Sequence, residues 1–290
     1  MTMFLQQWWL MLSPTDCHEL VVLEHAGAWK PTHRSGACKF CAAQDPSVLF
    51  LVETWADEAM LKKLHDDLQF DELWVVECVT RASGIALLWK NSMDIEVDSA
   101  SLNHIDVIIN KGKDDAWRFT GIYGHLELSR KAETWEMIRG LSRKFSSPWL
   151  CAGDFNEILK SHEKLGGLPR KGSEMRAFRN MVDECELLDL GYTSLKFTWR
   201  GTRPCRFVFE RLDRAFANSA WLELNPATRI QHFRAHSSDH NPILIKPEGI
   251  LPVWNKPFHF EQLWLREDGC GETIRAIWGY STNPSSMPTV

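Results

Sequence analysis

Residues 149–159 read WLCAGDFNEIL, an apolar run that is followed at once by a glycine, a carboxylate and an amide. The apolar part has the composition of a buried β-strand. Gly153 permits a backbone turn that most residues cannot make. Asp154 and Asn156 then stand two residues apart at the strand end, where alternate side chains lie on one face. The stretch therefore predicts a buried strand that presents two polar side chains at its end.

Asp154 and Asn156 carry functional groups that suit phosphate chemistry. A carboxylate accepts a proton or binds a hard cation, and an amide orients a phosphate or a water molecule. Asp and Asn are also frequent turn formers, because their side chains hydrogen-bond to nearby backbone. These residues alone therefore leave two interpretations open, a catalytic strand end and a plain turn.

Two other segments place acidic and imidazole groups beside an apolar strand. Glu53 follows the apolar part of FLVETW, and Asp239 and His240 precede the apolar part of HSSDHNPIL. Taken singly, Glu53 also suits the start of a helix, and the Asp-His pair suits a turn. Together with Asp154 they make a hydrolytic set. Carboxylates hold a divalent cation, one carboxylate activates water, and the imidazole stabilises charge on a phosphoryl oxygen.

Short runs rich in β-forming residues recur along the chain. They lie at 47–53, 73–77, 84–90, 105–110, 117–124, 149–156, 211–218, 229–235 and 242–246. Helical spacing of apolar residues occurs at 57–68, 129–145 and 173–190. Because strands and helices interleave without strict alternation, we predict an α/β protein with a mixed sheet covered by helices.

The composition of the 290-residue chain is that of a globular protein, with 44% hydrophobic and 24% charged residues. Its formal net charge of -5 excludes nucleic-acid binding by bulk positive charge alone. The charge is uneven, because residues 160–214 contain 12 Lys and Arg against 8 Asp and Glu. This local surplus suits either an ordinary mixed surface or a phosphate-facing one.

No apolar run approaches the ~18 residues of a membrane span, so none is predicted. The apolar N-terminus MTMFLQQWWLML lacks a basic region and is a poor match to a signal peptide. We therefore expect a nuclear or cytoplasmic location. Only Cys38 and Cys41 form a C-x-x-C pair. No second ligand pair for zinc is evident, so free thiols are predicted.

Six short motifs follow one another along the chain: VETW, GIYG, GDFNEIL, FTWRG, ERLDRAFAN and SDHNPIL. In this combination the chain resembles the endonuclease/exonuclease/phosphatase superfamily. More narrowly, it resembles the apurinic-type endonuclease domain of plant LINE-like (non-LTR) retrotransposons, with FHFEQLWL as a further plant-type motif. The resemblance implies a four-layer α/β sandwich, with two packed mixed β-sheets flanked by helices. It also implies DNA as the partner and no small-molecule cofactor.

The resemblance divides the chain into three expected regions. Residues 1–45 form an irregular segment that does not match the family. Residues 46–248 form the family-like domain, and residues 249–290 form a linker fragment and a disordered tail.

The matching positions also imply a site for a divalent metal. Glu53 and Asp239 would bind Mg²⁺ or Mn²⁺. Tyr123 would contact the scissile phosphate. Asp154 would orient or deprotonate the attacking water, and Asn156 would help to place water and phosphate.

Asp213 and His240 complete the implied site. Asp213 would support the imidazole of His240, which would donate to a phosphoryl oxygen. The implied reaction is cleavage of a DNA phosphodiester by water, leaving a 3′-hydroxyl.

The chain departs from the family on its N-terminal side. Family members open with a strand that carries an Asn, usually in a WN-x-RG stretch, whereas this chain has no Asn before Asn91. Residues 21–46 stand in its place, so we expect the first strand to be missing or altered and one catalytic amide to be lost. The reverse transcriptase that follows in full elements is absent as well, which suggests a detached module.

These observations leave three functions open. The first is a metal-dependent DNA endonuclease. The second is a phosphatase of the same superfamily acting on inositol phosphates or lipids, although the sequence shows no dedicated substrate loop. The third is a decayed and catalytically dead remnant that binds nucleic acid at most, because loss of an active-site amide costs a large factor in rate.

Overall fold

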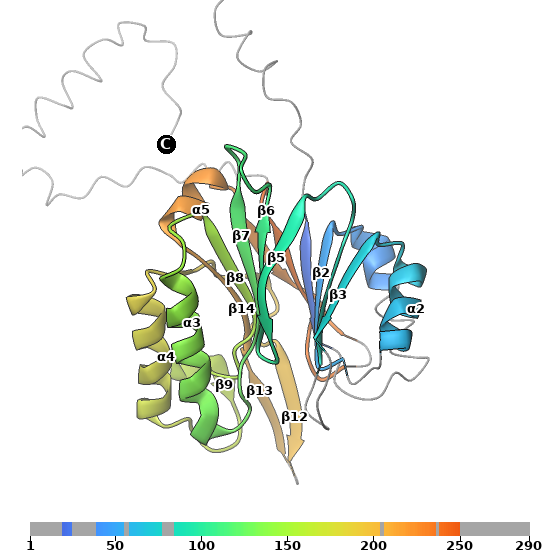
Figure 1. Cartoon of the computed structure of the whole chain (residues 1–290). Coiled ribbons are helices and arrows are strands. Elements are labelled where there is room, and N and C mark those ends of the chain that lie inside the picture. The colour runs from blue at the N-terminus through green and yellow to red at the C-terminus, as the bar shows by residue number, and fades with distance from the viewer. Residues whose placement is uncertain are drawn as a thin grey trace, which may run out of the picture. The chain divides into compact units, whose positions relative to one another are not determined.

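The computed structural model describes residues 19–24, 39–54, 58–76, 84–203, 206–235 and 238–249. Two large β-sheets pack face to face within these residues, and helices cover their outer faces (Figure 1). A smaller sheet adjoins them. None of the helices described in these ranges has the length and hydropathy that a bilayer-spanning segment requires.

The first large sheet contains seven strands: β1 (Leu20–Glu24), β2 (Val48–Val52), β3 (Glu72–Val76), β4 (Ile85–Trp89), β11 (Thr193–Ser194), β15 (Arg229–His232) and β16 (Ile243–Lys246). The second contains six: β5 (Ile95–Ser101), β6 (His104–Ile109), β7 (Trp117–Tyr123), β8 (Trp149–Asp154), β10 (Leu188–Asp189) and β14 (Asp213–Ala217). The small sheet contains β9 (Lys164–Leu165), β12 (Trp199–Arg203) and β13 (Arg206–Glu210). The helical elements are α2 (Glu58–Leu68), α3 (Lys131–Ser142), α4 (Gly172–Glu184), α5 (Ser219–Leu224) and the short 3₁₀ turns η1 (Leu128–Arg130) and η2 (Ser161–Glu163).

Both large sheets are mixed, as the interleaved sequence pattern predicts. The strand orders are β11-β15-β16-β1-β2-β4-β3 and β10-β14-β8-β7-β6-β5. β1 runs parallel to β2, and β7 runs parallel to β8. Most other neighbours, such as β14 and β8, are antiparallel.

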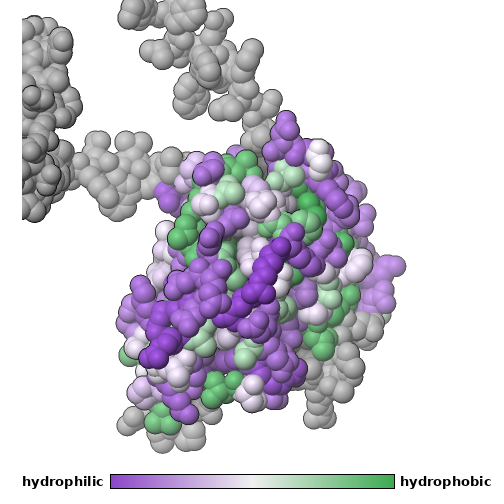
Figure 2. Space-filling view, turned by 60° about the vertical axis from the view of Figure 1, so that its left-hand side comes forward, coloured by the Kyte–Doolittle hydropathy of each residue, from purple (hydrophilic) through white to green (hydrophobic). Residues whose placement is uncertain are grey.

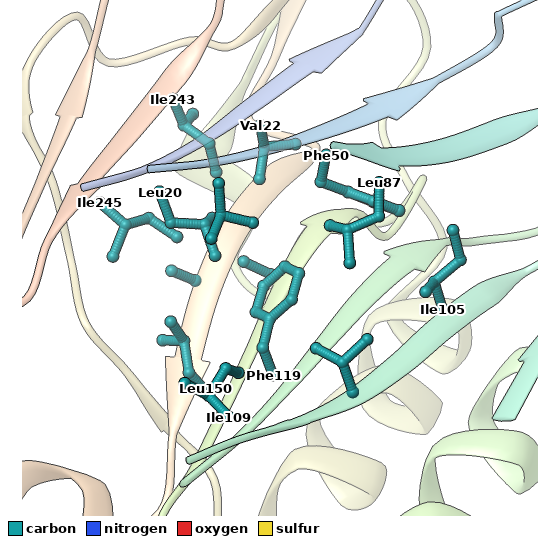
Figure 3. Close-up of a cluster of buried hydrophobic side chains, with 14 of the residues drawn as sticks. Leu20, Val22, Phe50, Leu87, Ile105, Ile109, Phe119, Leu150, Ile243 and Ile245 are labelled. Atoms are coloured by element: carbon teal, nitrogen blue, oxygen red, sulfur yellow. The ribbon is translucent and has the colours of Figure 1, made fainter. Parts of the chain in front are cut away.

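The main core lies between the two large sheets. Successive residues of a strand point to opposite faces, so Phe50 of β2 joins Leu87 and Phe119 in this core (Figure 3). Leu49 and Leu51 of the same strand point the other way and pack with α2. The run is apolar throughout because both of its faces are buried.

The outer face of the six-stranded sheet is covered by α3 and α4. Trp135 of α3 stacks on Phe178 of α4 with 4.7 Å between ring centroids, and both belong to a cluster that includes Phe155 and Phe216. The layers are therefore helix, sheet, sheet and helix, and the predicted four-layer α/β sandwich is confirmed.

Gly153 lies inside β8 and not in a turn after it, which differs from the expectation. Its φ is 149°, and a Cβ at this position would stand 2.0 Å from the carbonyl oxygen of Ile122. Glycine is needed because the backbones of β7 and β8 approach closely here. The strand continues through Gly153 and ends at Asp154.

The first strand was expected to be missing or altered; it is not missing, but it is altered in that it carries no Asn. Residues 20–24 form β1, which pairs with β2 on one side and β16 on the other. The segment 1–45 is thus not irregular throughout, and residues 39–44 of it are helical. The run LVVLE supplies apolar β-forming residues in place of the WN-x-RG motif. Backbone pairing between strands does not require that motif.

Other elements follow the predicted pattern with local exceptions. Each predicted β-run contains a strand, and each predicted helical segment contains a helix. α4 ends at Glu184, whereas the periodicity predicted a helix to residue 190, and residues 188–189 pair as β10 instead. β5 and the small sheet were not predicted. Most of the predicted linker at 249–290 lies outside the described residues.

His232 at the end of β15 is a buried titratable group that makes the stability of the fold depend on pH. Its Nδ1–H donates to the carbonyl oxygen of Leu195 (2.6 Å), and its ring stacks on Tyr192 at 4.7 Å. Its Nε2 is buried without a hydrogen-bond partner among the described residues. Burial is the main cause that lowers the pKa of His232 to about 4. The neutral imidazole is thus the form that the folded protein favours.

We expect His232 to make folding stability fall on acidification. A folded-state pKa below the unfolded value leaves stability intact above about pH 6.5 and removes it as pH falls toward 4. Between pH 7 and pH 5 this group should remove about 2 kcal/mol from the free energy of unfolding. Urea unfolding of wild type and His232→Asn at both pH values measures it. The Asn amide keeps a donor for Leu195 but does not titrate.

The exposed His162 provides the matched control for this prediction. His162→Asn should show the same loss between pH 7 and pH 5 as wild type, whereas the loss in His232→Asn should be about 2 kcal/mol smaller. Equal losses in all three proteins would contradict the assignment to His232.

Candidate active site

Three polar residues lie side by side at one end of the six-stranded sheet. Tyr123 at the end of β7 pairs in register with Asp154 at the end of β8, which pairs with Asp213 at the start of β14. Register neighbours on adjacent strands point to the same face. Ala152 and Ala215, two residues away on their strands, belong to the core between the sheets. The row therefore faces the space between the two sheets.

The seven-stranded sheet contributes Glu53 to the same end. Glu53 directly follows β2 and has a φ of 52°, which turns the chain out of the strand. Its Oε1 accepts a hydrogen bond from the hydroxyl of Tyr123 at 2.6 Å. Burial raises the pKa of Glu53, while the bond from Tyr123 acts in the opposite direction. One hydrogen bond thus joins the two sheets at this end.

Asp213 and His240 form a buried pair. The Nδ1–H of His240 donates to Asp213 Oδ2 at 2.9 Å, and His240 is 5% exposed. The preceding residue, Asp239, is exposed and accepts a hydrogen bond at Oδ2 from the indole N–H of Trp199 (3.0 Å). An isolated backbone bridge between Trp199 and His240 holds this segment beside the small sheet.

Asp154 and Asn156 are joined by a local hydrogen bond between a side chain and the backbone. The N–H of Asn156 donates to Asp154 Oδ1 at 2.8 Å, and its side-chain amide donates to the carbonyl oxygen of Gly124 at 2.9 Å. Asn156 adopts a φ of 54°, which Asn tolerates better than most residues. Asp154 Oδ2 is buried and has no hydrogen-bond partner among the described residues. Burial, followed by the nearby Asp213 carboxylate, raises the pKa of Asp154 to about 8.

An open pocket of about 240 Å³ adjoins these residues. It is lined by Glu53, Leu126, Asn156, Arg170, Trp199, Glu210, Leu212, Asp239 and His240. Four of the seven predicted site residues line it directly, and the other three contact these four through the bonds described above. Acidic, amide and imidazole groups from distant parts of the chain therefore meet at one place.

The donor set fits a hard cation that also takes ligands from its surroundings. Among the residues that the structure describes, no three His, Cys, Asp or Glu side chains are grouped to hold a metal on their own. Mg²⁺ is usually bound by one or two carboxylates together with water and substrate phosphate. The carboxylates of Glu53 and Asp239 line one pocket and meet that requirement. The C-x-x-C pair is not described as a whole, because Cys38 lies outside the described residues.

Several lining residues were not predicted from the sequence. Trp199 lines the pocket and donates to Asp239, and it also packs against the cluster of Ile158, Met175 and Leu212. Arg170 and Glu210 also line it, and no local pattern marks them. Arg170 lies in a loop that the sequence identifies only as turn-rich.

Part of the positive surplus at 160–214 is internal. Arg211 and Arg214 are 4% and 0% exposed and form ion pairs with Glu163 and Asp189. These two guanidinium groups are therefore not available to an outside partner. Other cations of the stretch are exposed, namely Lys160, Lys171, Arg176, Lys196 and Arg200.

A family model described as the endonuclease/exonuclease/phosphatase family matches residues 23–240. The match spans well over half of the chain, so the chain belongs to this family. Members of the family are typically hydrolases that act on phosphodiester bonds, and they generally use divalent metal ions. Among curated protein sequences, none matches this chain.

Solved structures share the fold at low sequence identity. The endonuclease domain of TRAS1, a telomere-specific non-LTR retrotransposon, has a TM-score of 0.59 and 15% identity over 79% of this chain and 97% of that one. The AP endonuclease LMAP from Leishmania major has a TM-score of 0.61 and 16% identity over 80% and 88%. The 3′ phosphatase NExo from Neisseria, bound to a product DNA hairpin, has a TM-score of 0.59 and 15% identity over 79% and 98%.

Proposed function

We propose that the protein is a metal-dependent phosphodiesterase that nicks DNA, similar to the endonuclease of a plant LINE-like retrotransposon. The observation that carries the proposal is the row formed by Tyr123, Asp154 and Asp213. Within this row, Asp154 presents a buried oxygen with no partner among the described residues. The pKa of Asp154 is raised to about 8, so its deprotonated form is a stronger base than an ordinary carboxylate and can accept a proton from water.

Each side chain then has a distinct role in hydrolysis. Glu53 and Asp239 would hold Mg²⁺ or Mn²⁺, which would supply positive charge to offset that of the phosphate. Asp154 takes a proton from the attacking water, while Asn156 helps to orient water and phosphate. The water oxygen bonds to phosphorus, the bond to the 3′ oxygen breaks, and that oxygen is protonated from solvent.

Charge that accumulates on the phosphoryl oxygens is stabilised by two donors. Asp213 orients the imidazole of His240 through the 2.9 Å bond, so that the ring can donate from its other nitrogen, Nε2, to the phosphate. Tyr123 would contact the same group once its single hydroxyl proton, which it donates to Glu53 in this structure, turns to the phosphate. His240 is held by Asp213 before substrate binds, which lowers the cost of reorganisation.

DNA is the substrate favoured by the surroundings of the pocket. Exposed cations of the stretch 160–214, such as Lys171 and Arg200, suit contacts with flanking phosphates. The similar structures include a retrotransposon endonuclease and an enzyme solved with a DNA hairpin. The side of the molecule drawn in Figure 2 is mostly hydrophilic, with hydrophobic residues in separate small patches, which suits a polar partner better than an apolar one.

Nicking of supercoiled plasmid tests the proposal. Wild type with Mg²⁺ should convert supercoiled to relaxed DNA, and EDTA should stop the conversion. His240→Ala should lower the rate by roughly 100-fold or more, because one donor to the developing charge is lost. His162→Ala removes an exposed imidazole and should leave the rate unchanged.

Two other results would replace this proposal. Retention of DNA on a filter without nicking would identify a catalytically dead remnant. Release of phosphate from an inositol phosphate, without nicking, would identify a phosphatase. The presence of β1 removes one reason to expect decay, but the missing family Asn stays a reason to expect a low rate.

A further inference from the structure

Arg170 is the one guanidinium group among the described residues that line the pocket. It lies between β9 and α4 and shares the pocket with Asn156 and His240. The side chain is 23% exposed, so it is held by the protein but reaches the pocket. None of the roles proposed above involves it.

The guanidinium of Arg170 lies near two carboxylates, but its Nε makes no hydrogen bond to either of them. Its Nε lies 3.5 Å from Glu157 Oε1 and 3.3 Å from Glu210 Oε1. The same Nε is buried and makes no hydrogen bond to any described residue. A guanidinium carries five N–H donors in a rigid planar fork, so this group keeps donors available for a ligand.

The two carboxylates do not need Arg170 for neutrality. Glu157 already pairs with Lys131 at 2.7 Å, and Glu210 pairs with Lys164 at 2.9 Å. Three cations therefore face two anions, and the surplus positive charge stands at the pocket. Lys131 also donates to the backbone carbonyl of Asn156 at 2.5 Å, which fixes this group of charges to the site.

We propose that Arg170 binds the two non-bridging oxygens of one phosphate of the substrate strand. The inference rests on the proposed function and specifies how the pocket grips its substrate. Phosphate is the ligand that best suits the site, because a planar fork matches two phosphate oxygens and forms charge-assisted hydrogen bonds. The remaining carboxylates of the pocket would repel a phosphate unless a fixed cation stood beside them.

Salt-dependent DNA binding tests this role apart from catalysis. A fluorescently labelled 20-base-pair duplex is titrated in EDTA at KCl concentrations from 50 to 200 mM, with anisotropy as the readout. Arg170→Met should weaken binding by ~10- to 100-fold. It should also reduce the slope of log affinity against log salt by ~0.9, the value for one phosphate contact. Arg170→Lys should keep the slope but bind more weakly than wild type, because it keeps the charge and loses the fork.

Arg143 provides the matched control. It is exposed and follows α3 at the end opposite to Lys131. Arg143→Met should keep the wild-type affinity and slope. A wild-type slope in Arg170→Met would overturn the inference, and a drop in melting temperature in that variant would then mark Arg170 as structural. Absence of DNA binding in wild type would instead count against the proposed function itself.

Discussion

Asp154→Asn is expected to lower the rate of DNA nicking by roughly 10³-fold or more, because it removes the base that takes a proton from water. The Asn side chain has nearly the same shape and keeps an oxygen that can accept the 2.8 Å bond from the N–H of Asn156. The loss should therefore reflect chemistry and not a rearranged loop. Steady-state nicking with Mg²⁺ measures it.

The same substitution is expected to raise the stability of the metal-free protein. The pKa of Asp154 is raised to about 8, so the folded state disfavours the charged carboxylate. A carboxyl whose folded pKa exceeds its unfolded value loses stability as pH rises from about 4 to about 8. Asp154→Asn lacks this loss, and urea unfolding in EDTA should show a gain at pH 7 that shrinks at pH 5.

Higher stability combined with lost activity would identify Asp154 as a group retained for function at a cost in folding. The exposed Asp94 is the control, since Asp94→Asn should change neither the nicking rate nor stability by a large amount. Full nicking activity in Asp154→Asn would remove the basis of the proposed mechanism.

Arg118→Met is expected to lower the free energy of unfolding by about 3–5 kcal/mol, because it leaves the Asp106 carboxylate buried and unpaired. Both side chains are buried, at 1% and 0% exposure. Arg118 donates to Asp106 Oδ1 from Nε (2.8 Å) and to Oδ2 from Nη2 (2.7 Å). Its Nη1 donates to the carbonyl oxygen of Leu141 (2.7 Å), which ties β7 to the end of α3.

The double variant distinguishes the interaction energy of the Arg118–Asp106 pair from the cost of leaving one buried charge unpaired. Asp106→Leu alone should cost a similar amount to Arg118→Met, because it leaves the guanidinium unpaired. Combining both substitutions should cost clearly less than the sum, since neither charge is then left alone. The exposed pair of Lys111 and Glu96 gives the comparison, and Lys111→Met should cost at most about 1 kcal/mol. If the losses in the double variant were additive, the interaction between the two side chains would contribute little to the free energy of unfolding.

The amino-acid sequence by itself determined the layered α/β class. The run 48–52 is apolar at every position, as a strand buried on both faces must be, and the period of 172–184 is that of a helix with one buried face. The polar residues at strand ends could also be predicted, because Asp154 and Glu53 each end an apolar run. These are local signals, and local spacing reports local structure.

Only the tertiary structure decided which strand ends meet. The row of Tyr123, Asp154 and Asp213 depends on strand pairing between segments far apart in the chain, and no local pattern encodes a neighbour at that distance. The same reason explains the first strand, since Leu20–Glu24 becomes a strand through its pairing with β2 and β16. It also explains Arg211 and Arg170, two arginines of one basic stretch. One is buried in ion pairs and the other lines the pocket, because burial is set by the fold around a residue and not by its neighbours in sequence.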